Sequence, residues 1–155
     1  MGDSLPLIIS VIVVVLLFSL LRRRGGTRNQ PDMIQAILFD VKLNQVLIDT
    51  YHRREKPKKF ERTNWLLYKD KISFLKETLK ENLKEAFALV DDINQQIQFA
   101  KKSKSESYKN IDLSKLRELL IVCREGLEEW MVDNTGQKEL PPRYPSLTGF
   151  LFGER

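Results

Sequence analysis

The most hydrophobic stretch of the chain is an unbroken apolar run near its N-terminus. Residues 5–21 (LPLIISVIVVVLLFSLL) carry no charge, and their only polar side chains are Ser10 and Ser19. As a helix, these 17 residues would reach about 25 Å, close to the ~30 Å hydrocarbon core of a bilayer. A soluble helix that is apolar on every side would need protein all around it, and the rest of the chain is small. The pattern therefore predicts a single transmembrane helix, with residues 1–24 as a membrane anchor.

The charges that flank this run predict its orientation. Asp3 precedes it, whereas Arg22, Arg23 and Arg24 follow it directly. A cleaved signal peptide would carry positive charges before the apolar run and a small-residue cleavage site after it, so an anchor is the better interpretation. By the positive-inside rule, the N-terminus lies outside and everything after Arg22 lies in the cytoplasm. We expect a single-pass membrane protein with a cytoplasmic C-terminal domain.

After a linker at residues 25–31, apolar residues return with helical spacing over residues 32–54. A helix that is apolar on two faces is typical of the centre of a bundle, or of packing against a membrane or a partner. The alternative is a β-hairpin of residues 37–41 and 45–49, which the β-branched content favours. One helical face would carry Ile34, Ile37, Leu38, Val41, Ile48 and Tyr51, and a second strip on the other side would carry Phe39, Leu43, Val46 and Leu47.

Two further stretches place apolar residues at alternating three- and four-residue steps. Residues 63–102 predict one long helix, because no Gly or Pro occurs between positions 58 and 125. Residues 112–133 predict another, with Asp112 as its N-cap. The polar loop between them, residues 101–110, is short enough for antiparallel pairing. The stripes are Trp65, Tyr68, Ile72, Leu75, Leu79, Ala86, Val90, Ile93 and Ile97 in the first helix, and Leu113, Leu116, Leu120, Cys123, Leu127 and Trp130 in the second.

These elements predict an all-α protein. A single N-terminal transmembrane helix is followed by a small three-helix, coiled-coil-like, antiparallel bundle over residues 32–135. A tail rich in proline and aromatic residues follows at residues 136–155. The same stripes would also suit a coiled coil between two chains, so the pattern leaves open whether the helices pair within one chain or between chains.

Composition argues against an enzyme. The net charge of +5 is spread among many acidic side chains, which is typical of a solvated helical surface rather than of a nucleic-acid binder. One cysteine, Cys123, and one histidine, His52, exclude an intrachain disulfide and disfavour the usual metal sites and catalytic triads. No Gly-rich phosphate loop, GxSxG or HExxH motif occurs. We therefore expect no catalytic residue, cofactor, metal or small-molecule substrate, and we interpret Cys123 as a core residue and His52 as a solvated one.

Basic side chains form the first group of candidate contact residues. Together they would make a positive surface for anionic lipid headgroups, at about 1 kcal/mol for each basic residue near the leaflet. An ordinary basic loop explains residues 52–62 equally well. Nucleic-acid binding is disfavoured, because the aromatic residues do not interleave with the basic ones. The candidates for the membrane interface are Arg22, Arg23, Arg24, Arg53, Arg54, Lys56, Lys58 and Lys59.

The C-terminal tail supplies the second group. Its large apolar side chains would be a liability if they were left exposed, so they are expected to cover a groove of the bundle or to dock on a partner. Residues 141–144 (PPRY) also match the PPxY pattern that WW domains bind, although a four-residue motif recurs by chance. The candidates for partner docking are Tyr144, Leu147, Phe150 and Phe152.

The function predicted from these features is that of a membrane-anchored, non-enzymatic helical interaction module: a scaffold, adaptor or accessory subunit on the cytoplasmic face. Membrane lipid and a protein partner, or a second copy of the chain, are the expected contacts. The alternatives are a small subunit of a larger integral membrane complex, and a basic surface that binds anionic lipid headgroups.

Overall fold

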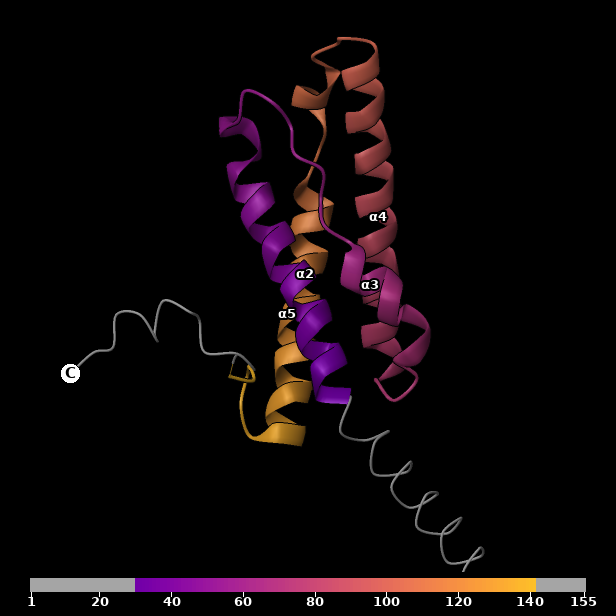
Figure 1. The fold of residues 1–155 in the computed structure, drawn as a ribbon, viewed down its shortest axis with the longest axis vertical. Coiled ribbons are helices and arrows are strands. Elements are labelled where there is room, and N and C mark those ends of the chain that lie inside the picture. Colours follow the sequence, from indigo (N-terminus) through magenta and orange to yellow (C-terminus); the bar gives the residue numbers. More distant parts are fainter. Residues whose placement is uncertain (1–29, 142–155) are drawn as a thin grey trace, which may run out of the picture.

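Helices account for all of the regular structure in the part of the chain that the computed structural model describes, residues 30–141 (Figure 1). The elements are α2 (Gln30–Thr50), η1 (Tyr51–Arg53), α3 (Thr63–Tyr68), η2 (Lys69–Lys71), α4 (Glu77–Lys102), η3 (Ser107–Asn110) and α5 (Ser114–Thr135). The predicted helical bundle is therefore confirmed, and the alternative β-hairpin at residues 37–49 is wrong, because α2 covers all of it. The predicted anchor at residues 5–21 and most of the tail lie outside the described residues. Within residues 30–141, no helix is both long and apolar enough to cross a bilayer.

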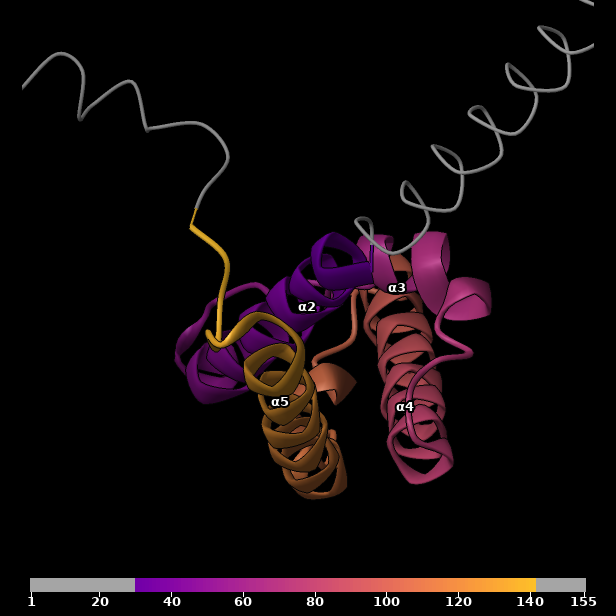
Figure 2. The ribbon, with the colours of Figure 1, turned by 90° about the horizontal axis from the view of Figure 1, so that it is seen from below.

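The three long helices lie side by side, with α5 antiparallel to both α2 and α4 (Figures 1 and 2). The short connection through η3 lets α4 and α5 pair within one chain, as the sequence predicts for adjacent antiparallel helices. Helix α5 packs against α2 and α4, whereas α2 and α4 hardly touch one another. The predicted stripes face this interior and are buried, apart from the partly buried Tyr68 and Trp130.

The long helix predicted over residues 63–102 is not continuous. Helix α3 ends at Tyr68, η2 follows, and the chain turns at residues 72–75 before α4 begins at Glu77. The Trp65 ring consequently stacks on the Phe87 ring, with the centroids 4.8 Å apart. In one straight helix these two residues would be about 33 Å apart, at 1.5 Å per residue. Ile72 and Leu75 are buried at this turn. They therefore fit the apolar spacing of the predicted helix, although the backbone reverses direction there.

An extended connection, residues 54–62, runs between α2 and α4 and is held by two asparagine side chains. Asn44 of α2 donates to the Glu61 carbonyl at 2.7 Å and accepts the Glu61 N–H at 2.6 Å. Asn94 of α4 accepts the Phe60 N–H at 2.7 Å and donates to the Phe60 carbonyl at 3.0 Å. Each amide thus satisfies both backbone groups of one residue, as a neighbouring β-strand would. We call residues 54–62 the strap.

Replacement of Asn44 by Ala should lower the free energy of unfolding by about 2–4 kcal/mol, because two backbone groups at a fully buried side chain lose their partner. A urea titration followed by far-UV circular dichroism measures this loss. Asn134→Ala is the matched control, since the exposed Asn134 bonds only to the Trp130 carbonyl of its own helix. A loss no larger for Asn44→Ala than for the control would show that the strap is not held in this way.

Asp40 is a second buried polar group of α2, and it attaches α3 to the bundle. Its carboxylate accepts the Trp65 N–H at 2.9 Å and the Asn64 side-chain amide at 2.7 Å. Burial raises the pKa of Asp40, although these hydrogen bonds act in the opposite direction. The folded state therefore binds the Asp40 proton more tightly than the unfolded state does, and the contribution of Asp40 to stability falls as pH rises through the folded pKa.

The pH dependence of stability should report this shift. On acidification from neutral pH towards about pH 4, the stability of the wild type relative to Asp40→Asn should rise, because only the wild type takes up the proton at position 40. Urea unfolding of both proteins over a pH series measures the difference, in which the other carboxylates cancel. A difference that is flat, or that shrinks on acidification, would contradict the raised pKa.

Candidate functional site

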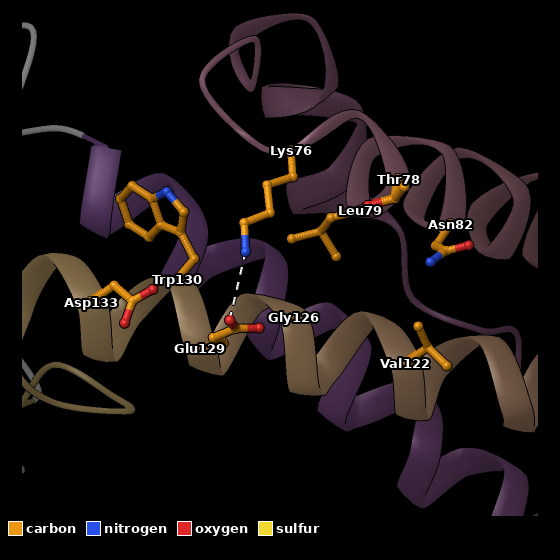
Figure 3. A pocket seen from close by; sticks show the side chains of 9 residues that line it. All are labelled: Lys76, Thr78, Leu79, Asn82, Val122, Gly126, Glu129, Trp130 and Asp133. Carbon is orange, nitrogen blue, oxygen red and sulfur yellow. Dashed lines mark ion pairs between the residues drawn. The ribbon is translucent and has the colours of Figure 1, made fainter.

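A hollow lies on the surface between the start of α4 and the end of α5 (Figure 3). Its volume is about 220 Å³. The apolar part of its lining consists of Leu79 from α4 and of Val122, Gly126 and Trp130 from α5. We call this hollow the α4–α5 groove.

Gly126 allows the Leu79 side chain of α4 to lie directly against the backbone of α5. A Cβ atom at position 126 would lie 2.7 Å from Cδ1 of Leu79, so any larger residue here would have to displace Leu79. Next to it, the partly buried Trp130 packs against the Phe74 ring, with the centroids 5.2 Å apart. Val122 is 47% exposed at the opposite end of the groove. The floor is thus apolar, rigid on the Trp130 side and open to solvent on the Val122 side.

Polar side chains surround this floor: Lys76, Thr78 and Asn82 on the α4 side, and Glu129 and Asp133 on α5. Lys76 lies 3.6 Å from Glu129 across the groove, but both side chains are largely exposed, so the pair contributes little to stability. Asp133 completes the acidic end of the rim. Further exposed carboxylates occur one helical turn away from the lining residues, at Glu81, Glu85, Glu118 and Glu125. Of the nearby lysines, Lys115 is paired with Glu85 at 2.6 Å. The groove therefore combines an apolar floor with an acidic surround.

The size and lining of the groove indicate what it can hold. Pockets for drug-sized molecules occupy roughly 300–1,000 Å³, so this space is too small for most of them. One large apolar side chain of a protein partner would fit, which is how interfaces commonly seat an anchor residue. Among residues 30–141, no cluster of three or more histidine, cysteine or acidic side chains has the arrangement of a metal site.

A second apolar surface is the predicted strip on the outer side of α2. Leu47 of this strip is buried and Leu43 is partly buried, but Phe39 and Val46 are 59% and 55% exposed. Ala36, Phe39, Leu43 and Val46 follow one another at steps of three, four and three residues, which is heptad spacing. We call these four residues the α2 stripe. Among the described residues, the outer side of α2 is therefore covered only in part.

The basic candidates beyond α2 lie at one end of the bundle. Arg53 and Arg54 follow the C-terminal end of α2, about 30 Å from Gln30, because α2 has 21 residues. Lys56, Lys58 and Lys59 follow in the strap and are exposed. Lys59 donates to Gln98 near the end of α4, so this surface continues towards Lys101 and Lys102. Arg22, Arg23 and Arg24 lie outside the described residues.

The remaining residues singled out in the sequence also lie partly outside and partly inside the described part of the chain. Tyr144, Leu147, Phe150 and Phe152 lie outside the described part of the chain. Cys123 is fully buried, which confirms it as a core residue, and burial raises the pKa of its thiol to about 12. His52 is exposed, with its ring edge-on to Tyr51 at 5.4 Å.

The sequence contains one signal for the groove. An isolated glycine inside a helical pattern often marks a close approach of another element. Gly126 is such a glycine, because it lies inside the predicted helix of residues 112–133. The partner helix, however, depends on the register of α4 against α5, which the sequence pattern does not specify. Comparisons with protein-family models, with curated proteins and with solved structures find no match.

The buried thiol leads to a test of the core. Cys123 should react with a thiol reagent at neutral pH far more slowly than a free cysteine, because its thiolate is disfavoured and its sulfur is covered. Labelling followed by mass spectrometry, in buffer and in urea, measures the two rates. Rapid labelling of the folded chain would mean that α5 does not pack as described.

Proposed function

We propose that the protein is a membrane-anchored, non-enzymatic interaction module that holds a protein partner at the cytoplasmic side of a membrane through the α4–α5 groove. The observation that carries this proposal is the open hollow between α4 and α5, whose apolar floor is formed by Leu79, Val122 and Trp130. The apolar run at residues 5–21 and the arginines that follow it support the anchor and its orientation.

The position of the groove suits a module attached at residue 30. The beginning of α4 and the end of α5 lie at the same end of the bundle as Gln30, where α2 begins (Figure 1). Residues 22–29, between the apolar run and α2, would span at most about 30 Å if they were fully extended. An anchored chain would therefore present the groove near the membrane surface, within reach of a membrane-bound or membrane-associated partner.

The chemistry of the groove defines the partner we propose. One large apolar side chain would enter the hollow that Leu79, Val122 and Trp130 line. Basic side chains around that anchor would meet the carboxylates of Glu129, Asp133 and their neighbours on α4 and α5. A helix with an apolar face and basic flanks combines both features. The partner is therefore expected to be an amphipathic basic helix of another protein.

The test is purification of the tagged full-length chain from its native membrane after cross-linking. Wild-type protein should remain in the membrane at alkaline pH and co-purify with a specific protein. Val122→Arg should reduce that recovery by about tenfold or more, because a long cationic side chain then replaces part of the apolar floor and repels the basic flanks of the partner. Ile121→Arg is the matched control: Ile121 is 38% exposed and does not line the groove, so recovery should be unchanged.

Two results would contradict the proposal. Release of the full-length chain by alkaline extraction would show that the chain is not anchored in the membrane. Equal recovery of the partner with Val122→Arg and Ile121→Arg would show that the partner does not bind in the groove.

The basic end of the bundle favours a second function, binding of anionic lipid headgroups. Arg53, Arg54 and the strap lysines are exposed together, but they lie at the opposite end from Gln30. The bundle would have to lie along the membrane for both Gln30 and Arg53 to be near it. Binding of the full-length chain to anionic vesicles in preference to neutral ones, weakened by salt, would support this function.

A further inference from the structure

The α2 stripe is an apolar surface that the described residues cover only in part, since Leu43 packs against the core but Phe39 and Val46 do not. Phe39 and Val46 are each more than half exposed, and Ala36 and Leu43 continue the surface on the same side of the helix. Heptad spacing of this kind normally faces another apolar element. Exposed aromatic and branched side chains in a row are also a liability for aggregation. The stripe therefore needs an occupant.

The last described residues bring the chain to the edge of this stripe. Helix α5 ends at Thr135, and the φ of 74° at the following Gly136 allows the chain to turn back. The Leu140 N–H then donates to Oε1 of Gln35 at 3.1 Å, and Glu139 forms an ion pair with Lys42. Gln35 and Lys42 lie four residues before and three residues after Phe39, so both are its neighbours on the surface of α2.

The segment that follows has the composition of a suitable occupant. Tyr144, Leu147, Phe150 and Phe152 are large apolar residues within eleven positions of Pro141. The stripe from Ala36 to Val46 is about 15 Å long, whereas eleven residues reach up to about 35 Å when extended, so the segment is long enough to cover it.

We propose that the α2 stripe is the docking site of the chain's own C-terminal segment, residues 144–152. The segment lies along Phe39, Leu43 and Val46, and it is guided there by the contacts of Glu139 and Leu140 with Lys42 and Gln35. This docking is independent of the α4–α5 groove, because the stripe lies on a different helix. The apolar end of the tail is thereby occupied within its own chain rather than offered to a partner.

A cysteine placed in the stripe tests the proposal, since the native Cys123 is buried and its pKa is about 12. In the full-length chain, reconstituted in neutral lipid nanodiscs, Val46→Cys should be labelled slowly by a thiol reagent. When the chain ends at Pro141, the same position should be labelled at least about tenfold faster. Ile121→Cys is the matched control on α5, and its rate should be the same in both chains.

Two further measurements identify the occupant. A Phe150→Asp and Phe152→Asp double substitution in the full-length Val46→Cys chain keeps the tail length and should restore fast labelling. A synthetic peptide of residues 142–155, added to the shortened chain, should restore protection, and the peptide with both substitutions should not.

The opposite results would overturn the proposal. Equal labelling of the full-length and shortened chains, whether both fast or both slow, would mean that the tail does not cover the stripe. Protection that disappears on dilution would assign the stripe to a second copy of the chain instead.

Discussion

The position of α2 relative to α4 depends on the hydrogen bonds that Asn44 and Asn94 make with the strap. Phe60 of the strap stacks on Tyr51 next to α2, and Trp65 of α3 stacks on Phe87 of α4, so these residues lie between the two helices. An extended backbone cannot enter a protein interior unless its polar groups are paired. The two amides provide that pairing on successive residues, and Asp40 does the same for the start of α3. The bundle therefore contains a polar layer between two of its helices.

Much of the fold follows from the spacing of apolar residues. The stripes of α4 and α5 are buried as predicted, and their antiparallel pairing follows from the short loop. The break between α3 and α4 was not predictable in this way, because Ile72 and Leu75 are buried in the observed turn as they would be in a helix. The stacking of Trp65 on Phe87 requires this break, because the two rings could not meet in one straight helix. Asn44 and Asn94 are ordinary polar positions in the sequence pattern, so their contacts with the strap were not predictable from it.

The candidate site was less predictable than the fold, for a related reason. A groove between two helices depends on which residues face each other, and only the packed structure shows that Gly126 lies against Leu79. The predicted basic residues beyond α2 do gather at one end of the bundle, as residues close in sequence would. Their predicted association with Arg22, Arg23 and Arg24 stays a prediction, and so does the role of the tail aromatics.

The asparagine contacts also affect which positions can change during evolution. Asn44 and Asn94 bind main-chain atoms, which every residue except proline offers in the same form, so they place no demand on the strap side chains that point to solvent. Lys58 and Lys59 are exposed and are free to be replaced, whereas Pro57 and Phe60 are buried and remain restricted by packing. In related chains, the surface charge of this end of the bundle can therefore drift while the two asparagines stay unchanged.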